Sequence, residues 1–182
     1  MRHDRRIPHG RPLVTIAYAI LAIVVLQRIG ELWYASSNTR ALKARGATEH
    51  GRGHYPLIVL LHASWLIAIA IGIRLDAAVR VLPLVLFVLL QALRVWVLAT
   101  MRQYWTTRII TLPDAPLVNS GPYQFVRHPN YLVVAGEIAL LPLVFGQVAN
   151  AMVFSVLNAM LLAWRVRVEE AALRPRRNPP SS

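Results

Sequence analysis

The chain has no cysteine, and charged residues are few. Charged types make up 15% of its 182 residues, whereas a soluble domain usually contains about 25%. The lack of cysteine excludes disulfides and thiolate metal sites, and we expect no metal centre. Apolar types reach 56% and the mean hydropathy is +0.46, which argues against a soluble enzyme and against a disordered chain.

Acidic residues are scarce as well, with 8 Asp and Glu against 20 Lys and Arg, and the net charge is +12. Such an excess can indicate nucleic acid, anionic lipid or membrane orientation. Here the basic residues lie between long apolar runs, as expected of residues that face lipid head groups. We therefore expect membrane lipid, and not nucleic acid, as the partner.

The apolar runs predict membrane-spanning helices. The runs 55–73 and 81–101 each suit one crossing of a hydrocarbon core about 30 Å thick. The run from Leu132 to Trp164 is too long for one helix, and Pro142 and Gly146 interrupt it, so we predict a hairpin of two helices. The expected spans of this single membrane domain, 1–182, are 12–34, 55–73, 81–101, 130–146 and 148–165.

The predicted fold class is all-α, a polytopic membrane helix bundle of about five transmembrane helices. The runs show no two-residue alternation, which excludes a β-barrel. A cleaved signal peptide is not expected, because the first apolar run is long and Arg28 and Glu31 precede the small residues that follow it.

Positive residues are unevenly distributed over the predicted loops. With five spans, the first loop, the third loop and the carboxyl tail share one side and hold thirteen, against six on the other. We therefore expect a multi-pass protein of the cell membrane with a cytoplasmic carboxyl tail and an outward amino terminus. The four arginines before the first span argue against an outward amino terminus. If the chain had four spans, the amino terminus would change sides and the carboxyl tail would stay cytoplasmic.

Two polar clusters, at residues 119–131 and 165–173, contain histidine, arginine, tyrosine and glutamate side chains that could bind a ligand or catalyse a reaction. In the first, Pro129 keeps His128 out of helical geometry just ahead of a span, beside a helix amino terminus that attracts carboxylates. In the second, Arg165 and Glu169 are four residues apart and share one face of a helix. Interfacial anchoring and a solvated helix end with ion pairs are the plain alternatives for these clusters.

Together the clusters resemble the isoprenylcysteine carboxyl methyltransferase family over residues 91–173. The first matches its Gly-x-Tyr and Arg-His-Pro-x-Tyr motif, and the second its Arg-x-x-x-Glu-Glu-x-x-Leu motif. The matching residues are Gly121, Tyr123, Arg127, His128, Pro129, Tyr131, Arg165, Glu169, Glu170 and Leu173. The resemblance implies an integral membrane methyltransferase with S-adenosylmethionine as cofactor, and no Gly-x-Gly-x-x-Gly motif follows a strand here.

The resemblance implies a cytoplasmic cofactor region over 102–131 and 165–174. Glu169 or Glu170 suits the cofactor's ammonium, and we lean towards Glu169; His128, the helix start and Arg127 suit its carboxylate. The residues implied in cofactor binding are Tyr123, His128, Pro129, Tyr131, Leu132, Glu169 and Glu170. Arg127 and Arg165 are expected to be catalytic, as clamps for an acceptor carboxylate.

Upstream, the segments 28–31, 46–49 and 53–56 resemble a bacterial branch of the family that accompanies type III polyketide synthases. That branch implies methylation of a hydroxyl on an alkylresorcinol or alkylpyrone type of lipid. Carboxyl methylation of an isoprenylcysteine-like thioether acid is the enzyme alternative. A small transporter or scaffold is the rival from another class, although no internal repeat is visible.

Ionisable residues inside the apolar runs are functional candidates. Glu137 is expected to be catalytic, as a base for a hydroxyl acceptor, because desolvation raises the pKa of a carboxyl; the alternative is a buried pair with Arg94. His62 is either a base or a packed core histidine. Arg28 and Glu31 are expected to form an interfacial ion pair, and Tyr104 and Trp105 to be membrane-interface residues.

Overall fold

The computed structural model describes residues 10–74, 78–113, 115 and 118–177. These form five α-helices and two short strands, and the all-α class is confirmed. The helices are α1 (Gly10–Ala44), α2 (Tyr55–Gly72), α3 (Val81–Met101), α4 (Pro129–Val144) and α5 (Val148–Arg177).

Four of these helices are long and apolar enough to cross a membrane, and α4 is a shorter apolar helix of 16 residues. The chain is thus an all-α membrane bundle. α1 and α5 both continue beyond the apolar runs that predicted them, to Ala44 and Arg177. The second polar cluster therefore lies within α5.

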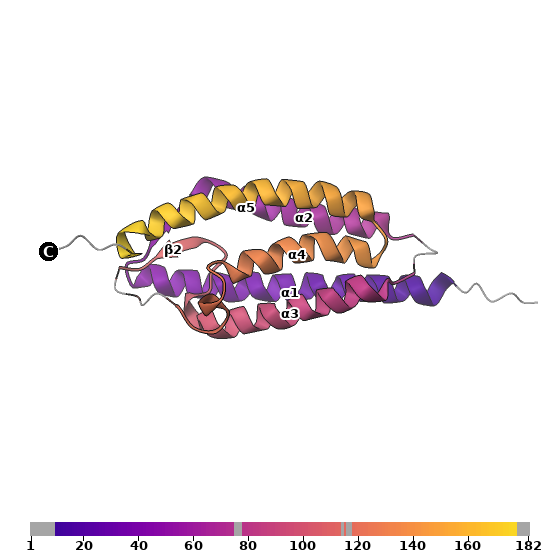
Figure 1. The fold of residues 1–182 in the computed structure, drawn as a ribbon, viewed down its shortest axis with the longest axis horizontal. Coiled ribbons are helices and arrows are strands. Elements are labelled where there is room, and N and C mark those ends of the chain that lie inside the picture. Colours follow the sequence, from indigo (N-terminus) through magenta and orange to yellow (C-terminus); the bar gives the residue numbers. More distant parts are fainter. Residues whose placement is uncertain (1–9, 75–77, 114, 116–117, 178–182) are drawn as a thin grey trace, which may run out of the picture.

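α4 is the central helix of the bundle. In the view of Figure 1 it lies between α2 and α5 on one side and α1 and α3 on the other, and it packs against α3 and α5. Val133, Ile138, Leu141 and Val144 of α4 are all at most 1% exposed. Their burial holds the start of α4, and with it the first motif, in place against its neighbours.

The hairpin predicted between the last two helices is confirmed. α4 ends at Val144 and α5 begins at Val148. Gly146 takes φ +73 there, a left-handed conformation that glycine adopts without strain. The side chain of Gln147 donates to the carbonyl of Ile69 at 3.0 Å, which ties the turn to α2.

The two strands were not predicted from the sequence. β1 (Thr48–His50) pairs antiparallel with β2 (Ile109–Thr111), with Glu49 opposite Ile110. Figure 1 shows β2 at the end of the bundle where α1 and α5 finish. Two segments treated as plain loops thus join into a small ribbon that contacts α5.

Candidate functional site

Both motifs meet at the side chain of Tyr131. Pro129 opens α4 as its first residue, where a missing N–H costs nothing, and His128 precedes it in non-helical geometry as predicted. The Tyr131 hydroxyl donates to Glu169 Oε2 and accepts from Arg165 Nε at 2.7 Å. Two segments more than 30 residues apart in sequence therefore form one hydrogen-bonded group.

His128 completes this group. Its ring stacks on Tyr131 with centroids 5.3 Å apart and planes 17° apart. Its Nδ1 lies 3.9 Å from Glu169 Oε1 and its Nε2 lies 3.6 Å from Glu170 Oε1. Both distances exceed an ordinary hydrogen bond, so a ligand can approach the ring nitrogens without breaking one.

A cavity of about 110 Å³ lies beside this group. It is lined by the short segment after α3, by β2 and by the motif residues. Its ionisable side chains include Arg108, Tyr123, His128, Tyr131, Arg165 and Glu169. Burial and the nearby Glu169 carboxylate raise the pKa of Tyr123 to about 12, so its phenol stays protonated and can donate.

Three buried polar atoms of this first cavity lack hydrogen-bond partners within the described part of the chain. They are Trp105 Nε1, His128 Nε2 and Asn130 Oδ1. Trp105 is only 4% exposed. Leaving a buried polar atom unpaired costs about 1–3 kcal/mol, so such a group of atoms in one cavity favours a polar ligand there.

A second cavity of about 270 Å³ lies between the helices and is mostly apolar. It is lined by α1, α2, α4 and α5 together with Arg94 of α3. Five residues line both cavities and form a shared wall: Trp105, Thr106, Asn130, Tyr131 and Arg165. A polar ligand and a lipid-like ligand would therefore meet at Tyr131 and Arg165.

The structure does not place every predicted site residue at a cavity. Arg127 is exposed, Leu132 is 54% exposed, and neither lines the two cavities. Pro129 is fully buried and shapes the start of α4. The Glu170 side chain is 45% exposed and contacts the site through His128 alone among the described residues.

Sequence reasoning missed Trp105 and Arg108. Trp105 was expected at the membrane interface, whereas it is buried, stacks on Tyr34 of α1 and lines both cavities. Arg108 lines the first cavity and lies 4.1 Å over the ring of Tyr55. The only signal in the sequence was their position in the polar segment 102–131.

Glu49 in β1 holds Arg108 in place. Its carboxylate, 2% exposed, pairs with both Arg108 and Lys43. Burial alone would raise the pKa of Glu49, but hydrogen bonds and charges from Lys43 and Arg108 outweigh it and hold this pKa below its usual value. The strand pair thus anchors one cation of the first cavity.

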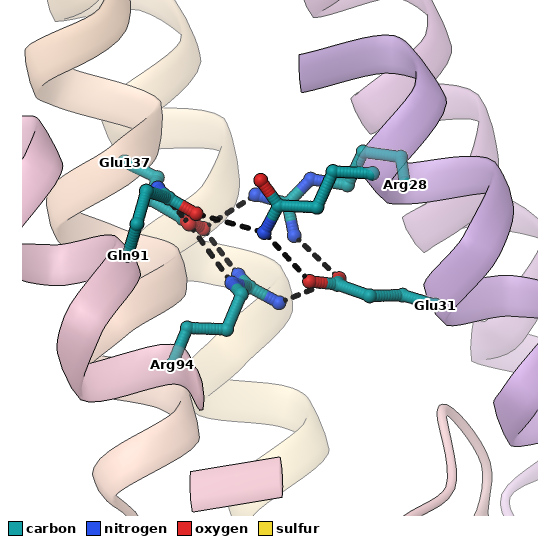
Figure 2. Close-up of polar contacts among 6 residues, drawn as sticks. Arg28, Glu31, Gln91, Arg94 and Glu137 are labelled. Carbon is teal, nitrogen blue, oxygen red and sulfur yellow. Dashed lines mark hydrogen bonds and ion pairs between the residues drawn. The ribbon is translucent and has the colours of Figure 1, made fainter. Parts of the chain in front are cut away.

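Glu137 forms ion pairs at the centre of the bundle. Its carboxylate accepts from both Arg94 and Arg28 and from the amide of Gln91, and the side chain is 1% exposed. The pair with Arg94, which was the sequence-based alternative, is therefore present. Glu31 completes the network by binding Arg28 at 2.9 Å and Arg94 at 2.8 Å (Figure 2). Glu137 itself lines neither cavity.

Comparison with known proteins gives one family. Residues 82–175 match the model of the isoprenylcysteine carboxyl methyltransferase (ICMT) family. The uncharacterized protein YpbQ of Bacillus subtilis (strain 168) is 35% identical over 163 residues, covering 86% of this chain and 96% of the relative. An uncharacterized protein of Haemophilus influenzae (strain Rd) is 27% identical over 168 residues, covering 88% and 94%. No solved structure gives a significant match.

Proposed function

The chain belongs to the isoprenylcysteine carboxyl methyltransferase family of membrane methyltransferases, and from this we propose that it moves a methyl group from S-adenosylmethionine to an oxygen of a lipid-like acceptor. The shared wall between a polar and an apolar cavity carries the proposal. An in-line displacement needs both partners held on either side of one point with water excluded.

The residues of the first cavity fit the cofactor chemically. Its amino acid end needs a carboxylate for the ammonium, which Glu169 supplies, and donors for the carboxylate. We assign those donors to Arg108 and His128, because Arg127 lies outside both cavities. When bound, the cofactor supplies a methyl carbon made electrophilic by its sulfonium.

The second cavity would hold the acceptor, with its apolar lining around an alkyl tail. Arg165 orients the acceptor oxygen in the shared wall. A hydroxyl acceptor also needs a base. Tyr131 Oη, hydrogen-bonded to Glu169, can take that proton while its own proton passes to Glu169. This route replaces the base role that the sequence suggested for Glu137, whose oxygens are engaged in ion pairs.

We propose a hydroxyl of an alkylresorcinol or alkylpyrone type of lipid as the acceptor, in line with the upstream motifs of the bacterial branch. The carboxylate of an isoprenylcysteine-like thioether acid is the second candidate. It is favoured by the buried guanidinium of Arg165, since a carboxylate is already a nucleophile and needs only a clamp. In either case the reaction takes place at the cytoplasmic face of the cell membrane.

The test combines binding with turnover. Calorimetry should show S-adenosylmethionine binding to the detergent-purified chain, and a folded preparation that binds none would refute the proposal. Methyl transfer is then measured to a 5-alkylresorcinol and to a prenylcysteine analogue. For a hydroxyl acceptor, Tyr131→Phe should do the greater harm because it removes the proton route. For a carboxylate acceptor, Arg165→Leu should.

A further inference from the structure

The second cavity contains a buried amide on α5. The side chain of Asn158 lines this cavity and is only 3% exposed. It forms no hydrogen bond with any other residue in the described part of the chain. Burying an amide without a partner costs free energy, because the hydrogen bonds that water made to it are lost. Asn158 therefore has a donor and an acceptor available for whatever occupies the cavity.

Asn158 lies on the same face of α5 as Arg165, which belongs to the shared wall. The two residues are seven positions apart in sequence, which is close to two turns of 3.6 residues and about 10 Å along the helix axis. Leu161 and Leu162 lie between them and line the same cavity. This wall of the cavity is therefore polar at Arg165, apolar over the next turn, and polar again at Asn158.

His62 is a second polar side chain of this cavity, two turns into α2. Its Nδ1 is 2.8 Å from the carbonyl oxygen of Ile58. A carbonyl only accepts, so this nitrogen donates within its own helix. His62 thus already has one hydrogen bond in the protein, whereas both ends of the Asn158 amide are open to a ligand.

The charged side chains at the depth of Asn158 form a balanced network of two arginines and two glutamates. They are Arg28, Arg94, Glu31 and Glu137. Glu137 follows Tyr131 of the shared wall by six residues on α4, about 9 Å along the helix axis. Because the charges of the network cancel, an ion bound there would lose its hydration without gaining a counter-charge. A neutral polar group of a ligand therefore suits this part of the cavity.

We infer that Asn158 is a specificity-determining residue that binds a neutral oxygen in the tail of the acceptor, about 10 Å from the oxygen that is methylated. The inference rests on the proposed function and narrows its substrate class. The acceptor is an amphiphile whose chain carries a ketone or a hydroxyl past its first few carbons, and the Asn158 amide donates to that oxygen. A plain hydrocarbon chain would leave the amide unpaired.

The experiment moves a ketone along the acceptor chain. The head group is the resorcinol or the thioether acid, whichever the wild type methylates, and the ketone stands on the second, fifth or eighth carbon of one chain length. The fifth carbon is the one that reaches about two helical turns from the methylated oxygen. The three isomers lose the same hydration on binding. The wild type should prefer the fifth-carbon isomer in kcat/KM by at least about fivefold, as for one neutral hydrogen bond.

Two variants separate recognition from packing. Asn158→Leu keeps the size of the side chain and removes its hydrogen-bonding group. It should abolish the preference, with turnover of the unsubstituted chain, the cofactor Kd and the thermal stability in detergent unchanged, because no hydrogen bond within the protein is lost. Asn150→Leu is the matched control on α5, since Asn150 donates to the carbonyl of Ala68 and lines neither cavity. It should lose stability and keep the preference.

Equal kcat/KM for the three isomers, or a preference for another carbon, would overturn the inference and leave the methyltransferase proposal intact. A preference that survives in Asn158→Leu would do the same. So would a large loss of stability in that variant, since it would show that the amide holds the fold. A folded wild type that binds no S-adenosylmethionine and methylates neither head group would overturn both proposals.

Discussion

At the scale of single residues, Tyr131 lies between the cavity that we propose for the cofactor and the cavity that we propose for the acceptor. Its hydroxyl bridges Arg165 and Glu169, its ring stacks on His128, and it lines both cavities. The three partners hold the ring in one orientation from different directions. The two short motifs thus each supply part of one hydrogen-bonded group.

The two adjacent glutamates of α5 should differ in effect. Glu169 lines the first cavity and accepts from Tyr131, whereas Glu170 is 45% exposed and lines neither cavity. We expect Glu169→Gln to weaken S-adenosylmethionine binding by at least about tenfold, as for one hydrogen bond to a charged group. Glu170→Gln should change the Kd by less than about threefold. Calorimetry of both variants decides, and equal losses would contradict this geometry.

Glu137 should act through stability. Glu137→Gln leaves the two guanidiniums of Arg94 and Arg28 with one carboxylate, that of Glu31, and breaking a buried pair costs about 3–5 kcal/mol. Thermal unfolding in detergent should show a large fall in stability. The double variant Glu137→Gln, Arg94→Leu should recover most of it, and the exposed Glu170→Gln is the control. A stable Glu137→Gln that fails only on hydroxyl acceptors would instead support the base role suggested by the sequence.

At the scale of elements, the short α4 creates the site. With 16 residues it rises about 24 Å, while α1 and α5 run on beyond its start. Residues between Met101 and Thr111, with Tyr123, therefore line one cavity together with Asn130 and Tyr131 at the amino terminus of α4, and the β1–β2 ribbon contacts α5. Tyr131 of α4 and Arg165 of α5 both line this first cavity.

The ribbon should loosen in acid through Glu49. The folded pKa of Glu49 lies below its ordinary value of 4.5, so its ion pairs are fully present above that value and are lost as pH falls through the folded pKa. Thermal unfolding should show wild type more stable than Glu49→Gln near neutral pH. The gap should close as pH falls below about 4.5.

Arg52→Gln is the control for the ribbon, because Arg52 is 75% exposed and 3.8 Å from Glu49. An exposed pair of this kind contributes little. A stability gap between wild type and Glu49→Gln that persists unchanged into acid would show that packing, not charge, holds the ribbon.

At the scale of the whole molecule, the sequence predicted the helices better than their contacts. Long apolar runs predict helices directly, and Pro142 with Gly146 marks the turn between α4 and α5. Helices that are apolar all round carry little periodicity to say which faces meet, so the bond between Arg28 and Glu137 was not predictable. The pairing of β1 with β2 joins segments about 60 residues apart, which local propensity does not encode.

The candidate site was likewise predicted only in part. The motif residues Tyr131, Arg165 and Glu169 were predicted because their spacing matches a family pattern. Trp105 and Arg108 were not, because their roles depend on how the polar segment folds over α4. Arg127 belongs to the motif by sequence yet lies outside both cavities, since residues 125–127, which follow the short turn at 121–124, are exposed.

Orientation in the membrane is the property of the whole molecule that the charges predict. Arg28 and Arg165 were counted as loop residues but line the second cavity, between the helices. Without them, eleven positive residues remain on the site side against six on the other. The asymmetry therefore persists, and the site end should face the cytoplasm.

The absence of cysteine makes this orientation directly measurable. Arg45→Cys and Asn119→Cys place exposed thiols at the site end, and Ala78→Cys places one between α2 and α3 at the opposite end. A membrane-impermeant maleimide should label Ala78→Cys in intact cells, and the other two only after lysis. The unsubstituted chain should stay unlabelled throughout. Labelling of Arg45→Cys and Asn119→Cys in intact cells would place the site outside, where cytoplasmic S-adenosylmethionine cannot reach the first cavity, and would contradict both the charge argument and the proposed reaction.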